Sequence, residues 1–190
     1  MLRDILTRVP GVVTWPCDEI NYIWRHGNVR APTDEFEPEF VTPDVQKYVQ
    51  YAFDQLDGKD VTHIVEKTCA NSLRVGFVDR ILPNACYIHL VRDGRDVALS
   101  ASQRWTARLD IPYLLRKARF VPKADLPYYA QRYLRSRLHR LFSKQKRLSF
   151  WGPRYDGMTA AHAKHSLLEV CALQWQRCIE RSDAALQCIN

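Results

Sequence analysis

Glycine is scarce in this chain of 190 residues: there are seven glycines, and no two lie closer than five positions apart. This spacing excludes a GxGxxG dinucleotide fingerprint. A GxxxxGK[ST] phosphate loop is absent as well, because the one pair of glycines five positions apart, Gly152 and Gly157, is followed by Met158 and not by lysine. The six cysteines form no CxxC pair, which disfavours a zinc ribbon or a thioredoxin-type site. No apolar run approaches the roughly 20 residues that span a bilayer. We therefore expect one cytoplasmic globular domain, residues 1–190, with reduced thiols.

Positive charge is concentrated in one part of the chain. Residues 101–150 contain thirteen Lys and Arg and two Asp and Glu, whereas the net charge of the whole chain is +7. Aromatic side chains such as Trp105 and Tyr133 are interleaved with the basic residues of this stretch. The combination favours an anionic partner, single-stranded nucleic acid included. A solvated helix face is the alternative interpretation.

Strands and helices are predicted to alternate in the first half of the chain. Apolar runs predict strands at 12–15, 61–65 and 86–91, and helical spacing predicts helices at 2–9, 43–56, 71–82 and 93–104. This order predicts parallel pairing and an α/β fold class for residues 1–104. Residues 105–190 show no strand pattern and are predicted to be a basic, mostly helical part, with helices at 127–148 and 162–186.

Polar residues follow the predicted strands, at the sheet edge where open parallel sheets bind ligands. Arg92 ends the third strand, and Ser100 lies on the helix that follows it. A guanidinium and a hydroxyl placed there predict a phosphate site, because the arginine fork matches phosphate oxygens. The alternative is an ion pair between Arg92 and Asp96 at a strand–helix junction.

Two further candidates follow the other predicted strands. Lys67 comes after the second strand, where an ammonium can stabilise charge on a transferring group; the alternative is an exposed loop lysine. Asp18 and Glu19 come after the first strand, where a carboxylate can act as a general base. The alternative for this pair is an acidic helix start.

The stretch EKTCANSLRVGFVDRILPNACYIHLVRDGRDVALS, residues 66–100, resembles sulfotransferases that use 3′-phosphoadenosine 5′-phosphosulfate (PAPS). It is most similar to bacterial proteins related to tyrosylprotein sulfotransferases, with a weaker resemblance over residues 2–25 and 149–179. A lysine-containing loop, a helix, a Pro-Asn-Ala turn and a strand ending in Arg-Asp-Gly-Arg are collinear with the family. The resemblance implies a three-layer α/β/α fold with a parallel sheet, like that of P-loop NTPases.

The resemblance also implies roles for single residues. Arg92 and Ser100 match the pair that grips the 3′-phosphate of PAPS, and Lys67 matches the lysine that stabilises the bridging oxygen and the sulfuryl group. Glu19 falls near the catalytic glutamate of the family, with Asp18 as its competitor. The implied reaction is in-line sulfuryl transfer to a hydroxyl or phenol, without a metal, leaving adenosine 3′,5′-bisphosphate. The sequence does not identify the acceptor, and a peptide tyrosine, a glycan hydroxyl and a small molecule all stay open.

Two family elements have no counterpart in this sequence: the glycine-containing loop that holds the 5′-phosphosulfate, and the final strand-and-loop region. Cys69 also stands where the family usually has proline. We therefore expect a domain truncated at both ends that binds PAPS weakly. The alternative function is a non-catalytic module that binds anions or single-stranded nucleic acid through residues 104–147, although no recognised nucleic-acid motif supports it.

Overall fold

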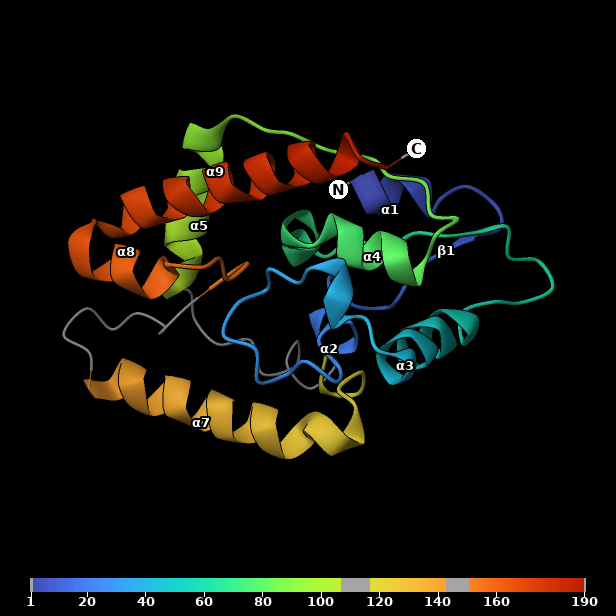
Figure 1. Ribbon diagram of the computed structural model, residues 1–190, viewed down its shortest axis with the longest axis horizontal. Coiled ribbons are helices and arrows are strands. Elements are labelled where there is room, and N and C mark those ends of the chain that lie inside the picture. The colour runs from blue at the N-terminus through green and yellow to red at the C-terminus, as the bar shows by residue number, and fades with distance from the viewer. Residues whose placement is uncertain (1, 107–116, 143–150, 190) are drawn as a thin grey trace.

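A computed structural model describes residues 2–106, 117–142 and 151–189. Within these residues the chain is mostly helical, and a small parallel sheet lies toward one side of the molecule (Figure 1). The strands are β1 (Val12–Val13) and β2 (His63–Ile64). The α-helices are α1 (Leu2–Leu6), α2 (Asn21–Trp24), α3 (Pro43–Asp54), α4 (Val75–Ile81), α5 (Gly94–Thr106), α7 (Leu126–Phe142), α8 (Met158–Lys164) and α9 (Leu167–Leu186). The 3-10 turns are η1 (Pro38–Phe40), η2 (Cys69–Leu73) and η3 (Lys123–Asp125).

The sheet confirms that the first two predicted strands pair in parallel. Val12 lies opposite His63 and Val13 opposite Ile64. Gly11 precedes β1 at φ +80°, and a Cβ there would lie 2.8 Å from the Thr62 hydroxyl oxygen. A residue with a side chain would therefore strain the entry to the sheet. Because the strands are parallel, the segments that follow them leave the sheet at the same edge.

Helix ends follow the capping signals in the sequence. Thr42 precedes α3, and its hydroxyl accepts a hydrogen bond from the Val45 amide at 3.3 Å, with Pro43 in the first turn. The predicted C-terminal helix at 162–186 is divided in the structure into α8 and α9. The division lies at Ser166, which forms a capping box with Glu169 and so begins a new helix.

Two apolar cores hold the described elements together. The first packs α3 and α4 around Trp15, Trp24 and Phe77, which are each at most 4% exposed. The second lies between α5 and α9, which cross closely in Figure 1. Here Gly94 approaches α9 so tightly that a Cβ would lie 2.7 Å from the Trp175 ring. None of the described helices is both long and apolar enough to cross a membrane.

The strand predicted at 86–91 is wrong. This segment is extended, but within the described part of the chain no hydrogen bond reaches the backbone of residues 86–92. Its side chains hold it instead: the Tyr87 hydroxyl donates to Asp79 at 3.2 Å, and the His89 Nε2 lies 3.0 Å from the Ser182 hydroxyl. Ile88 and Leu90 are 66% and 65% exposed. An apolar run forms a strand only where a neighbour supplies backbone partners, and among the described residues β1 and β2 pair with each other alone.

The coarse fold class is nonetheless α/β, since a parallel sheet is flanked by helices. The predicted three-layer arrangement requires a larger sheet. Among the described residues the sheet has two strands, so the three layers stay a prediction. The basic helix predicted at 127–148 begins at Leu126 and is described as far as Phe142, so its predicted end lies outside the described residues. The predicted helical character of the second half is confirmed for α7, α8 and α9.

Candidate active site

Glu19 and Lys67 meet beyond the carboxyl edge of the sheet. Glu19 follows β1 and Lys67 follows β2, and the Lys67 Nζ lies 3.0 Å from the Glu19 Oε1. The same carboxylate oxygen accepts a hydrogen bond from the Cys69 amide at 3.4 Å. Both side chains are partly exposed, at 29% for Glu19 and 35% for Lys67, so a ligand can reach either one.

A buried threonine between these residues fixes their relative position. The Thr68 hydroxyl accepts a hydrogen bond from the Ile20 amide at 3.1 Å and donates one to the Glu66 carboxylate. The other oxygen of Glu66 accepts a hydrogen bond from the side-chain amide of Asn71 at 2.8 Å. Thr68 is the immediate neighbour of Lys67, and Ile20 that of Glu19. The network therefore ties together the two backbones that carry the site.

The electrostatics of the site favour an ionised pair. Burial raises the pKa of the Glu19 carboxyl, but the charge of Lys67 and the hydrogen bonds at this oxygen outweigh it and leave the pKa below its usual value. Burial lowers the pKa of Lys67, whereas Cys69 and Glu19 raise it, with a net rise. Lys117 adds a further positive charge near Glu19. The site thus holds a carboxylate that can take a proton beside cations that can stabilise an anion.

Asp18 points to a different neighbour. Its carboxylate lies 3.8 Å from the Arg3 guanidinium on α1 and is 53% exposed. Arg3 in turn donates to the Cys17 carbonyl at 2.7 Å, which holds α1 against this loop. Of the two adjacent acids, Glu19 therefore makes the ion pair with Lys67, and Asp18 lies beside Arg3 at the surface.

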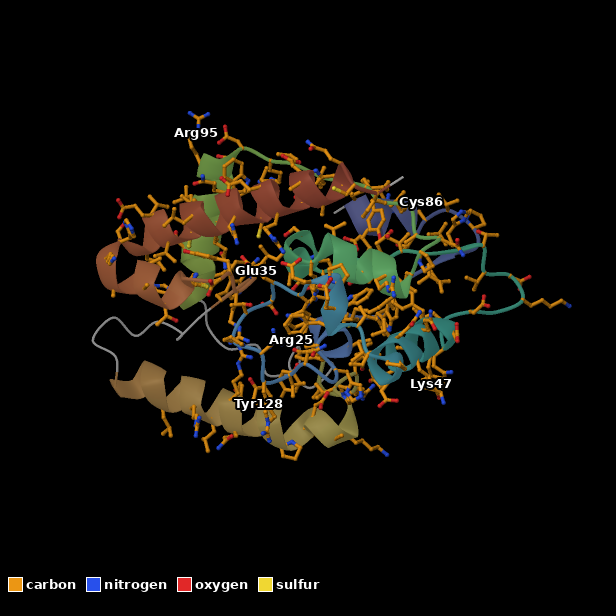
Figure 2. The ribbon with its side chains drawn as sticks, viewed as in Figure 1. Arg25, Glu35, Lys47, Cys86, Arg95 and Tyr128 are labelled. Carbon is orange, nitrogen blue, oxygen red and sulfur yellow. The ribbon has the colours of Figure 1, made fainter. Side chains whose placement is uncertain are left out.

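Arg92 and Ser100 are not brought together in the same way. Both are exposed, and no hydrogen bond joins their side chains within the described residues. The reason is the unpaired segment before Arg92, which does not enter the sheet and so does not carry the guanidinium to its edge. Nearby, Arg95 extends from the start of α5 and pairs with Asp93 at 2.6 Å (Figure 2). Arg92 and Ser100 therefore remain a predicted phosphate pair.

The space around Glu19 is a shallow depression that encloses no room for a water molecule, so its cavity volume is about 0 Å³. Pockets that enclose a ligand of drug size usually measure about 300–1,000 Å³. The depression is lined by Arg3, Thr14, Trp15, Cys17, Asp18, Glu19, Ile20, Glu66 and Lys67. Among the residues that the structure describes, no group of three or more His, Cys, Asp or Glu side chains is placed to hold a metal ion.

Sequence reasoning missed Glu66, Thr68 and Asn71, which support the site through hydrogen bonds, and of these Glu66 also lines the depression. Glu66 is partly buried, and burial raises its pKa despite its hydrogen bonds. The sequence does contain a signal for these residues, namely the polar run Glu66-Lys67-Thr68 after a predicted strand. In an extended chain successive side chains point to opposite faces, so some residues of such a run can face inward and others outward. Which of them faces inward depends on the segment at 17–20, which is distant in sequence.

Comparison with known proteins gives one match. The model of a family described as "Sulfotransferase family" matches residues 23–150, more than half of the 190 residues. The match includes Lys67, Arg92 and Ser100, and it begins after Glu19. No curated protein and no solved structure matches the chain.

Proposed function

Since this chain belongs to the sulfotransferase family, its chemistry is sulfuryl transfer in general, and we propose that it moves the sulfuryl group of PAPS to a hydroxyl or phenol. The observation that carries this proposal is the contact of 3.0 Å between Glu19 and Lys67 at the carboxyl edge of the sheet. It places a proton acceptor and a cation at the same edge of the sheet, and in-line transfer between two oxygens uses a base for the attacking oxygen and a cation for the departing one.

In this proposal Glu19 takes the proton of the acceptor hydroxyl, and the Lys67 ammonium stabilises the charge on the oxygen from which the sulfuryl group departs. Arg92 and Ser100 hold the 3′-phosphate. An anionic donor beside Lys67 competes with Glu19 for the ammonium. Because Lys67 lowers the pKa of Glu19, this competition raises that pKa and makes the carboxylate a stronger base when donor is present. The donor is held weakly, since the depression is small and the sequence has no glycine-rich phosphate loop.

The pH dependence of turnover tests the coupling between Glu19 and Lys67. A general base works in its deprotonated form, so turnover falls as the pH drops through the pKa of Glu19. Lys67→Ala removes the charge that lowers this pKa. We expect the acid limb of the pH–rate profile to move to higher pH in this variant, besides an overall loss of rate. A limb that stays in place would show that Glu19 is not the titrating base.

Binding of adenosine 3′,5′-bisphosphate, measured by calorimetry, tests the donor site. We expect Arg92→Ala to weaken binding by about tenfold to a hundredfold, because charge-assisted hydrogen bonds contribute about 1.5–3 kcal/mol. Arg95→Ala is the matched control, since Arg95 lies on the same segment, is 91% exposed and pairs only with Asp93 among the described residues. It should bind the nucleotide as the unchanged protein does.

Two outcomes contradict the proposal. One is the absence of saturable nucleotide binding together with the absence of any transfer in a single-turnover assay. The other is binding of a single-stranded oligonucleotide that ignores Arg92 and weakens steeply with salt, as expected for contacts with a phosphate backbone. That result would favour an anion-binding module over an enzyme.

A further inference from the structure

Helix α7 turns an apolar stripe toward solvent. Leu126, Ala130, Leu134 and Leu138 are spaced four residues apart, which places them along one face of the helix. The three leucines are 41%, 59% and 46% exposed, and Ala130 is exposed as well. A helix that belongs to a globular core normally buries such a stripe. This stripe therefore lacks an apolar neighbour in the described part of the protein.

A different side of α7 attaches it to the rest of the chain. Tyr129 packs edge-on against Tyr22, with ring centroids 5.2 Å apart. At the start of the helix, Asp125 lies 2.8 Å from the ring nitrogen of His26. Figure 1 shows α7 along the side of the molecule opposite α9, joined to the body near its N-terminal end. The leucines are thus not used for this attachment and are available to a partner.

The charge of α7 narrows the choice of partner. Its seventeen residues include four arginines and no acidic residue, and residues 101–150 carry thirteen basic and two acidic side chains. A second copy of the same helix would bring like charges together. A nucleic acid would satisfy the arginines but leave the leucines in water. A surface that is anionic outside and apolar just beneath satisfies both sets of side chains.

We propose that α7 is a membrane-surface helix, which lies in the headgroup layer of an anionic bilayer with Leu134 and Leu138 inserted. Apolar burial and attraction to anionic lipid act together in such helices, so both are needed for stable binding. Because Tyr129 contacts Tyr22, which follows Glu19 closely in sequence, the candidate active site would lie beside the membrane. The proposal does not depend on the chemistry of that site.

Vesicle flotation of the full chain tests this proposal. The unchanged protein should float with phosphatidylcholine vesicles that contain phosphatidylglycerol, and much less with phosphatidylcholine alone. The double variant Leu134→Glu with Leu138→Glu should reduce the bound fraction at least about tenfold, because it replaces the inserted apolar groups with anions. Arg135→Glu should weaken binding less and should make it more sensitive to salt.

The control is Leu168→Glu on α9, because Leu168 is 49% exposed and lies on a different helix. It should bind vesicles as the unchanged protein does, and circular dichroism should show that every variant is folded. The proposal is overturned by failure to bind anionic vesicles, by equal loss in the Leu168 variant, or by unaltered binding in the double variant. Leucine-dependent dimerisation or oligonucleotide binding without vesicle binding would also overturn it.

Discussion

Glu19→Gln should lower the rate of sulfuryl transfer by about 10²–10⁴-fold, the range expected for loss of a general base. Glutamine keeps the shape of the side chain and can still accept a hydrogen bond from Lys67, but it cannot take the proton of the acceptor at neutral pH. The measurement is release of adenosine 3′,5′-bisphosphate from PAPS with a phenolic acceptor. It is best made under single-turnover conditions with protein in excess, because donor binding is expected to be weak.

The neighbouring acid supplies the matched control for this variant. Asp18→Asn changes the same functional group one residue earlier, where the carboxylate is 53% exposed and lies 3.8 Å from Arg3. We expect it to change the transfer rate less than about threefold, since surface ion pairs contribute little. Equal losses of rate in the two variants would mean that the negative charge of this loop matters, and not a carboxylate at position 19 in particular. Full activity of Glu19→Gln would exclude the carboxylate as the base.

Asp34→Ala should lower the free energy of unfolding by about 3–5 kcal/mol, the cost of removing one partner from a buried ion pair. The Asp34 carboxylate lies 2.6 Å from the Arg25 guanidinium and 3.8 Å from that of Arg74. Both arginines are buried, at 2% and 1% exposure, and Arg25 is labelled in Figure 2. Without Asp34, two cations would be held in a poorly solvated core without their counter-charge.

Urea denaturation at neutral pH measures this effect, and Asp54→Ala is the control because Asp54 is exposed at the end of α3. The control should change stability by less than about 0.5 kcal/mol. Burial raises the pKa of Asp34, but the two arginines lower it by more than burial raises it, so the pKa in the folded state lies below the usual value. The stabilisation is therefore complete at neutral pH and is lost as the pH falls through that lowered pKa. Similar losses in both variants would contradict a special role for Asp34.

The elements that were predictable from sequence are those whose signals are local. The Thr42-Pro43 pair marks the start of α3, and the apolar runs at β1 and β2 with helices between them predicted parallel pairing, which the structure confirms. The pairing also accounts for the meeting of Glu19 with Lys67, because residues after parallel strands leave the sheet at one edge.

The features that the sequence did not predict correctly depend on partners that are distant along the chain. The run at 86–91 has the composition of a strand, but pairing depends on a neighbour and not on the run itself. The burial of Asp34 with Arg25 and Arg74 was not predictable either, because charged residues are normally placed at the surface. Their contacts join three separate parts of the chain. The roles of Arg92 and Ser100 likewise stay a prediction, since the structure leaves both at the surface.

The unbonded backbone before Arg92 has a thermodynamic consequence. Within the described residues, no hydrogen bond reaches the backbone of 86–92, so this stretch is held by the Tyr87 and His89 side chains alone and keeps backbone freedom that a bonded strand would already have lost. A ligand that engages Arg92 must first restrict that freedom, at roughly 1–2 kcal/mol for each residue fixed. The attraction between the Arg92 guanidinium and an anionic ligand is thus partly offset by the loss of backbone conformational entropy on binding. Anything that immobilises the stretch beforehand should tighten nucleotide binding without touching the nucleotide.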